Sequence, residues 1–271
     1  MQNIMADIKN RSFKHAYLLY GEETYLKRSY KNRLIQAILP EGDTMNLNVY
    51  EGKGIHVKEI IDVAETVPFF SDYRLILMEN TGFFKSANED MAEYVKGIPE
   101  STILLFVEEE IDKRNRLYKA VKDRGYVCEM KRQTDAKLIA WVLGMMGKEG
   151  KKIKEEDMRF FLSRTGTDME NIYQEWQKLS SYTAGREIVT KEDIEAVCSV
   201  QITGKIFDMI HAISEKRQKK ALEYYYELLT LKEPPMRILF LMAREYHLLL
   251  MIKQLSREGK ASAEIAKQTK L

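Results

Sequence analysis

The first candidate site is a short turn that follows an apolar segment near the start of the chain. The apolar run 16–20 ends at Gly21, and Glu22, Glu23 and Lys27 follow where a helix is expected to begin. An apolar strand, a glycine and then a helix is how a phosphate-binding P-loop begins. A P-loop also requires the pattern GxxxxGK[ST], which presents backbone N–H groups, a lysine and a hydroxyl to phosphate and magnesium. That pattern is missing from this turn.

Two acids occupy the turn instead. Glu22 and Glu23 complement the positive end of a helix dipole, and they repel a polyphosphate that would bind in the same place. We therefore expect this turn, which includes Gly21 and Lys27, to be a degenerate nucleotide loop. The domain around it is expected to resemble an NTPase without hydrolysing nucleotide, and no cofactor is predicted.

The second candidate site is an aromatic turn formed by Val67, Pro68, Phe69 and Phe70, just before the apolar run 75–78. Adjacent residues at a helix end point about 100° apart, so one ring can face the core while its neighbour projects outward. Two alternatives are open. Either both rings belong to the core, or they form a protruding apolar plug of the kind that becomes an interface hot spot. In the second case Pro68 limits the conformations lost on docking.

The sequence offers no candidate residues for a metal site or a disulfide bond. The four histidines lack HExxH spacing, and Cys128 and Cys198 form no CxxC motif, so no metal site is predicted. The sparse cysteines fit a reducing compartment. No window of 18 uninterrupted apolar residues suggests a membrane span, and we expect a cytoplasmic protein.

The composition limits how the chain can contact nucleic acid. The 43 Lys and Arg against 41 Asp and Glu leave a net charge of +2, so no chain-wide basic field attracts DNA. Any DNA contact has to come from local basic clusters, which are usually solvated helix faces. Such clusters occur at 113–116, 131–132, 151–154 and 216–220.

The first half of the chain alternates between apolar runs and helix-like segments. The runs are 16–20, 47–50, 74–78, 102–107 and 126–128. Short apolar strands separated by helices favour a mostly parallel sheet that is covered on both faces. We therefore expect residues 1–135 to form an α/β domain, and at 271 residues with 45% apolar content the chain has room for further domains.

After Met130 the strand signals stop and the pattern becomes helical. Thr167 with Glu170 predicts a capping box, in which each residue binds the backbone of the other at the start of a helix. Thr190 with Asp193 predicts another helix start. The remaining chain is therefore expected to be helical.

A break in this helical pattern divides the second half. Residues 199–204 have no helical period and predict a hinge, so we expect one helical unit at 136–204 and another at 205–271. Pro234 and Pro235 predict the start of a long helix in the latter. Because 261–270 reads as a helix that is only beginning, we expect this last unit to be incomplete.

Three stretches of the chain together resemble one protein family. They are YLLYGEETYLKR, VPFFSDYRLILME and RTGTDMENIYQEWQKLSSY, and they resemble the delta subunit of the bacterial DNA polymerase III clamp loader. Their order and spacing carry the resemblance, which spans nearly the whole chain. It implies an AAA+ α/β domain without ATPase activity, then a small helical lid domain and an all-helical collar domain.

The resemblance also implies a site and a function. The family's apolar clamp-binding pair falls on Phe69 and Phe70, beside Val67 and Pro68, although the family often has an aliphatic residue where Phe69 stands. The implied function is a non-catalytic subunit of a DNA-directed DNA polymerase holoenzyme that binds the beta sliding clamp and opens it. The implied partners are this clamp, the tau/gamma and delta-prime subunits, and primer-template DNA in the assembled complex. The implied location is the nucleoid-associated replisome of a bacterial cytoplasm.

Two other function classes compete with this one. An active P-loop enzyme is opposed by the sequence of the loop itself. A non-catalytic stator subunit, as in the delta-prime relatives, commonly carries zinc cysteines and a Ser-Arg-Cys element, and this chain has neither. Clamp binding by the isolated chain distinguishes the preferred function from a stator.

Overall fold

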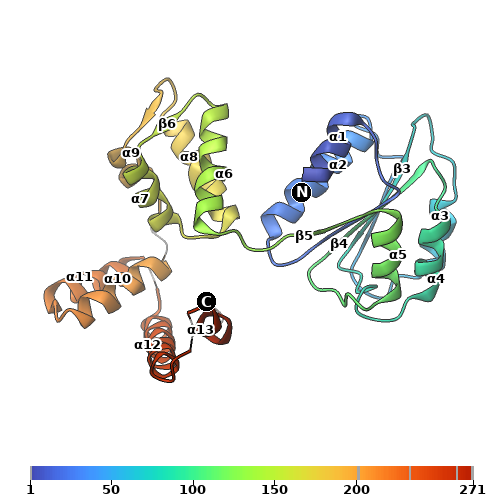
Figure 1. Ribbon diagram of the computed structural model, residues 1–271. Coiled ribbons are helices and arrows are strands. Elements are labelled where there is room, and N and C mark those ends of the chain that lie inside the picture. Colours follow the sequence, from blue (N-terminus) through green and yellow to red (C-terminus); the bar gives the residue numbers. More distant parts are fainter. Residues whose placement is uncertain (1, 200–201, 232, 261, 270–271) are drawn as a thin grey trace. The chain divides into compact units, whose positions relative to one another are not determined.

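In the computed structural model, the apolar runs of the N-terminal half form one parallel five-stranded sheet, as predicted. The strand order is β2-β3-β4-β1-β5. The strands are β1 (Ala16–Tyr20), β2 (Leu47–Glu51), β3 (Arg74–Glu79), β4 (Thr102–Glu108) and β5 (Tyr126–Glu129). The structure describes residues 2–199, 202–231, 233–260 and 262–269. It divides into two units, Met1–Asp135 and Ala136–Leu271 (Figure 1).

Helices cover both faces of this sheet, as a parallel sheet requires. In the first unit α1 and α2 lie on one face, and α3, α4 and α5 lie on the other (Figure 1). A single 3₁₀ turn, Val95–Gly97, follows α4. The helices are α1 (Gln2–Asn10), α2 (Thr24–Ile38), α3 (Val57–Ala64), α4 (Glu89–Tyr94) and α5 (Arg116–Arg124).

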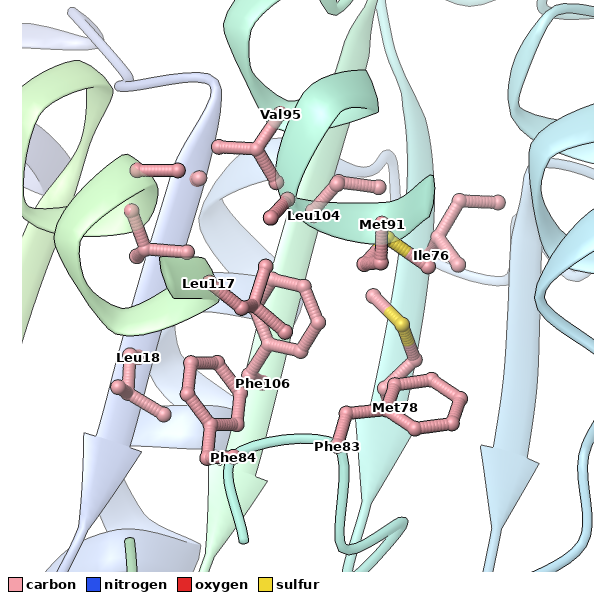
Figure 2. Packing of buried hydrophobic residues seen from close by; sticks show 14 of the residues in the cluster. Leu18, Ile76, Met78, Phe83, Phe84, Met91, Val95, Leu104, Phe106 and Leu117 are labelled. Atoms are coloured by element: carbon pink, nitrogen blue, oxygen red, sulfur yellow. The ribbon is translucent and has the colours of Figure 1, made fainter. Parts of the chain in front are cut away.

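The core beneath α4 and α5 is built from alternate strand residues. Leu18 and Phe106 come from neighbouring strands β1 and β4, and they pack with Met91 of α4 and Leu117 of α5 (Figure 2). The Phe106 ring meets Phe84 edge to face, with ring centroids 5.1 Å apart. All five side chains are fully buried, and each contributes about 1.5–3 kcal/mol to stability through burial alone.

The second unit is almost entirely helical. Its helices are α6 (Asp135–Lys148), α7 (Glu155–Thr165), α8 (Met169–Tyr182), α9 (Lys191–Val197), α10 (Ile202–Ser214), α11 (Gln218–Thr230), α12 (Pro235–Arg257) and α13 (Ser262–Thr269). Two short segments, β6 (Lys152–Ile153) and β7 (Ile188–Val189), pair in parallel. The expectation that strands end at Met130 is therefore wrong at these two segments, which are too short to give a periodic signal. The long helix starts at Pro235, as predicted.

Of the two helix starts predicted from capping residues, one is confirmed and the other uses a different capping residue. The pair Thr190 and Asp193 forms a complete capping box at α9. The box predicted from Thr167 and Glu170 is wrong, because Asp168 caps α8 and accepts a hydrogen bond of 2.8 Å from the amide three residues on. Two capping residues stand side by side in the sequence here, and the one directly before the first helical residue is used.

The predicted hinge is also partly wrong. Helix α10 begins at Ile202, so residues 202–204 are helical, whereas residues 200 and 201 lie outside the described residues. A domain boundary near 204 stays a prediction. Beyond it, α10, α11 and α12 share a small apolar core that includes Ile210, Leu228 and Ile238. Within the described parts of the chain, none of the helices combines the length and apolar character needed to cross a bilayer.

A glycine allows α5 to approach the sheet closely. A Cβ built at Gly125 would lie 1.9 Å from the backbone oxygen of Ala16, so Gly125→Ala forces β1 and the end of α5 apart. We expect this change to lower the free energy of unfolding by about 2 kcal/mol or more, as measured by denaturant titration. Gly97→Ala is the matched control, because a Cβ there meets nothing within 4 Å. Equal stability of the two variants would contradict this account of the packing.

Candidate functional site

The aromatic turn between α3 and β3 is exposed. Phe70 is 92% accessible to solvent, Val67 82% and Phe69 54%, and Pro68 is partly buried beside them. Neither ring belongs to the core, so the first of the two alternatives from the sequence does not describe these side chains. The turn presents a small apolar surface, and its role as a binding site stays a prediction.

The two rings of the turn support each other. The Phe69 and Phe70 rings meet edge to face, with centroids 4.6 Å apart and an angle of 83° between their planes. Phe70 has a φ of +48°, a region that bulky residues rarely adopt because the Cβ crowds the backbone. Such a conformation costs about 1–3 kcal/mol and persists only where the surroundings fix it.

Asn46, just before β2, fixes the turn from one side. Its Oδ1 accepts a hydrogen bond of 2.7 Å from the Phe69 N–H, and its Nδ2 donates one of 2.9 Å to the Phe69 carbonyl. The same Nδ2 donates to Oδ2 of Asp43 at 2.7 Å. This amide hydrogen bond holds the pKa of Asp43 below its ordinary value. The backbone of Phe69 is therefore hydrogen-bonded at both its N–H and its carbonyl.

Arg74, the first residue of β3, fixes the start of the turn. Its Nε donates to the Thr66 carbonyl at 3.1 Å, and its Nη2 donates to the Val67 carbonyl at 3.2 Å. Its Nη1 donates to Oδ1 of Asn48 on β2 at 3.0 Å. Sequence reasoning did not find a role for Asn46 or Arg74. The signal for Arg74 was its position at the start of a buried apolar strand, because a buried charge needs hydrogen-bonding partners nearby.

The degenerate nucleotide loop follows β1. Gly21 has a φ of +121°, and a Cβ there would lie 2.5 Å from the Met130 backbone oxygen, so the turn needs glycine. Glu23, which is buried, donates its backbone N–H to that same oxygen at 3.0 Å and directly precedes α2. Glu22 is exposed and forms a 3.5 Å ion pair with Arg132.

Lys27 and Glu108 are buried next to this loop. The Lys27 Nζ donates to the Glu108 backbone carbonyl at 3.4 Å, and desolvation lowers the pKa of the amine. The Glu108 carboxylate accepts from the N–H of Thr81 at 3.0 Å and from its hydroxyl at 2.7 Å. Burial raises the pKa of Glu108. Through these bonds the Glu108 side chain closes the loop after β3.

The two candidate sites lie at opposite ends of the strands. The aromatic turn leads into β3 at its amino end, whereas Gly21, Thr81 and Glu108 follow or end β1, β3 and β4. Because all strands are parallel, the carboxyl ends meet at one edge of the sheet and the amino ends at the other. A molecule bound at the edge of the sheet that carries the nucleotide loop would therefore not cover the aromatic turn.

The basic clusters are interleaved with acids. Lys113 pairs with Glu129 at 3.2 Å, and Arg114 pairs with Asp112 at 2.9 Å. The hydrogen bond from Arg114 lowers the pKa of Asp112 to about 2. These pairs reduce the positive field that DNA phosphates would meet. Within the described residues, no group of three or more His, Cys, Asp or Glu is placed to hold a metal ion.

Models of known protein families match segments of both units. A model described as "DNA polymerase III, delta subunit" matches residues 17–131, and one described as "DNA polymerase III delta subunit, C-terminal domain" matches residues 203–271. Among curated proteins, DNA polymerase III subunit delta of Bacillus subtilis is 25% identical over 99% of this chain and 81% of its own length. The probable DNA polymerase III subunit delta of Aquifex aeolicus is 20% identical over 91% of this chain and 73% of its length.

Solved structures support the fold. The DNA clamp loader delta protein of Bacillus subtilis superposes with a TM-score of 0.74 at 24% sequence identity. The match covers all of this chain and 83% of that one. The α/β sheet followed by helices is thus an architecture found in a solved protein.

The buried Glu108 predicts a pH dependence of stability. Burial raises the pKa of Glu108 in the folded protein above its value in the unfolded chain. The stabilisation that Glu108 gives is therefore fully present below the unfolded pKa, and it is lost as the pH rises through the folded pKa. Glu108→Gln keeps an acceptor for Thr81 but carries no charge. We therefore expect its stability relative to wild type to increase as the pH rises above the ordinary glutamate pKa, and then to level off, in thermal denaturation. A pH-independent difference in stability between the variant and wild type would contradict the assignment.

Proposed function

Because the chain belongs to the family of DNA polymerase III delta subunits, we propose that it binds the beta sliding clamp and opens it for loading onto primed DNA. The observation that carries this proposal is the exposed Phe70 ring on a turn fixed by hydrogen bonds to a buried asparagine. A large ring held in water is unfavourable for an isolated protein, but it suits a protein that inserts the ring into a partner's pocket.

The binding element in this proposal is Val67, Pro68, Phe69 and Phe70. Its partner is an apolar pocket on the clamp that desolvates both rings. Transfer of a Phe side chain from water to such a pocket contributes about 1.5–3 kcal/mol, and the T-shaped ring pair presents one continuous surface. Because the backbone of the turn is already ordered, little conformational entropy is lost on docking.

Clamp opening follows from differential affinity. A ligand shifts a conformational equilibrium only as far as its affinities for the two states differ. The chain therefore has to bind the open ring more tightly than the closed ring. We infer that docking of the aromatic turn, with the preceding helix α3 (Val57–Ala64), favours a clamp whose subunit junction has separated.

The chain acts in this scheme without hydrolysing ATP itself. The turn after β1 lacks the P-loop residues, and the amine of Lys27 is buried against the Glu108 carbonyl rather than exposed to a phosphate. Glu22 and Glu23 add negative charge in the same place. ATP is then consumed by neighbouring subunits of the loader, in the bacterial cytoplasm at the replisome.

The other partners are proposed to bind the second unit. We assign residues 136–204 to a lid domain and residues 205–271 to a collar that contacts the tau/gamma and delta-prime subunits. Support comes from large apolar side chains that are more than one-third exposed on α11 and α12: Leu222, Tyr226, Met236, Leu239, Phe240, Tyr246, Leu249 and Leu250. Contacts with primer-template DNA are expected only in the assembled complex, through phosphates.

Removal of the Phe70 ring is the direct test of this function. We expect Phe70→Ala to weaken binding to the clamp of the same organism by at least about 2 kcal/mol, or roughly 30-fold, because the ring is the central anchor. Isothermal titration calorimetry measures the affinity, and release of clamps from circular DNA measures opening. Both are expected to fall together.

Phe240→Ala is the matched control, because Phe240 is an exposed phenylalanine on α12 in the other unit. Its clamp affinity is expected to equal that of wild type. Unchanged affinity in a folded Phe70→Ala variant would refute the assignment of the site. Failure of folded wild type to bind the clamp would favour a stator function instead.

The nucleotide loop gives a separate prediction. We expect ATP with Mg²⁺ at millimolar concentration to leave the melting temperature of the chain unchanged, because the loop lacks the P-loop pattern and its two glutamates repel a polyphosphate. A nucleotide present at 100 times its Kd would stabilise the chain by about 2.7 kcal/mol. A saturable rise in melting temperature would therefore revive the P-loop enzyme hypothesis.

A further inference from the structure

The conformation of Phe70 needs an external support. Its φ of +48° lies in the left-handed region. Its ring meets Phe69 edge to face but is 92% exposed, so packing of the ring contributes little to the stability of the turn. Contacts made by the neighbouring backbone therefore have to hold it. The nearest such contact is made by the backbone of Phe69, whose N–H and carbonyl are both hydrogen-bonded to one side chain.

That side chain, Asn46, is itself held rigidly. It is only 1% exposed, and its backbone carbonyl accepts the Leu75 N–H of β3 at 2.8 Å. Its backbone N–H donates to Oδ1 of Asp43 at 3.1 Å, and its Nδ2 donates to Oδ2 of the same carboxylate. With two acceptors around Nδ2 and one donor facing Oδ1, the orientation of the amide is determined.

We propose that Asn46 is a positioning residue for partner binding, which acts by holding Phe70 in its projecting, left-handed conformation before the partner arrives. This inference rests on the proposed function, because it assigns part of the clamp affinity to preorganisation of the turn. The amide touches no partner itself. Its effect passes through the Phe69 peptide to the Phe70 ring.

The surroundings suggest that removal of this amide leaves the fold intact. Arg74 independently binds the carbonyls of Thr66 and Val67 at the start of the turn. The strands β2 and β3 retain their own parallel pairing. Without Asn46 the turn stays attached at its base, but its tip is free to sample other conformations. Phe70 then has to be ordered at the moment of binding, which lowers affinity.

A double-mutant cycle tests this mechanism. Clamp affinity is measured by calorimetry for wild type, Asn46→Ala, Phe70→Ala and the double variant. We expect Asn46→Ala to weaken binding about five- to tenfold when Phe70 is present. In the Phe70→Ala background the same change is expected to have less than about a twofold effect, because the ring through which Asn46 acts is gone.

The matched control is Asn115→Ala, which removes a comparable amide elsewhere in the first unit. The Asn115 side chain donates to the carbonyls of Phe83 and Ser86 and accepts from the Leu117 N–H. The Asn115→Ala change is expected to lower the melting temperature without changing clamp affinity. A merely structural role for Asn46 would give the same pattern as this control.

A gentler variant covers the case in which Asn46→Ala does not fold. Asp43→Ala removes one support of the amide from a partly exposed position, and it is expected to weaken binding about two- to threefold, again only while Phe70 is present.

The outcomes separate this inference from the proposed function. Equal effects of Asn46→Ala in both backgrounds, or no effect in either, would overturn the positioning role while Phe70→Ala still loses affinity. No binding by folded wild type would overturn the proposed function, and this inference with it.

Discussion

The constraint on which the first unit depends is that a parallel sheet must be buried on both faces. The central strands β1 and β4 are buried along their whole length, so their residues have to be apolar on both sides and helices have to cover each face. This requirement places α3, α4 and α5 on one face and α1 and α2 on the other (Figure 1). Polar and functional groups are then left to the two ends of the strands.

Each end of the sheet uses buried polar groups for a different purpose. At the carboxyl end, Glu108 and Lys27 bind backbone groups and fill the space beside the degenerate loop. At the amino end, Asn46 and Arg74 bind backbone groups of an exposed turn. Buried polar side chains are costly unless they are hydrogen-bonded, so both sets are tied to fixed backbone positions. At the carboxyl end these bonds close the degenerate loop, and at the amino end they hold the aromatic pair exposed to solvent.

The sequence predicted the regular elements well because their signals are local. The apolar run 16–20 and the four later runs became strands with nearly the predicted bounds, and Thr190 capped α9 as expected. Local signals failed where two neighbours compete, as at Thr167 and Asp168. They also failed for the two-residue strands β6 and β7, which pair only through the fold.

The candidate site was predicted only in part. Residue types and the resemblance both pointed to Val67, Pro68, Phe69 and Phe70, but the exposure of these side chains could not be read from residue types, because adjacent aromatics are equally ordinary in a core. The role of Asn46 depends on a contact across 23 positions of sequence. Such a contact exists only after β2 and β3 have paired, and no periodic pattern encodes it.

The central claim is that the turn at residues 66–73 docks on the sliding clamp. Hydrogen–deuterium exchange of the chain with and without clamp tests it most directly, because the readout is local and needs no mutation. The account predicts that slowed exchange on clamp binding includes residues 66–73 and excludes the loop at 20–24 on the opposite edge of the sheet. Slowed exchange elsewhere, with residues 66–73 unchanged under saturating clamp, would contradict it.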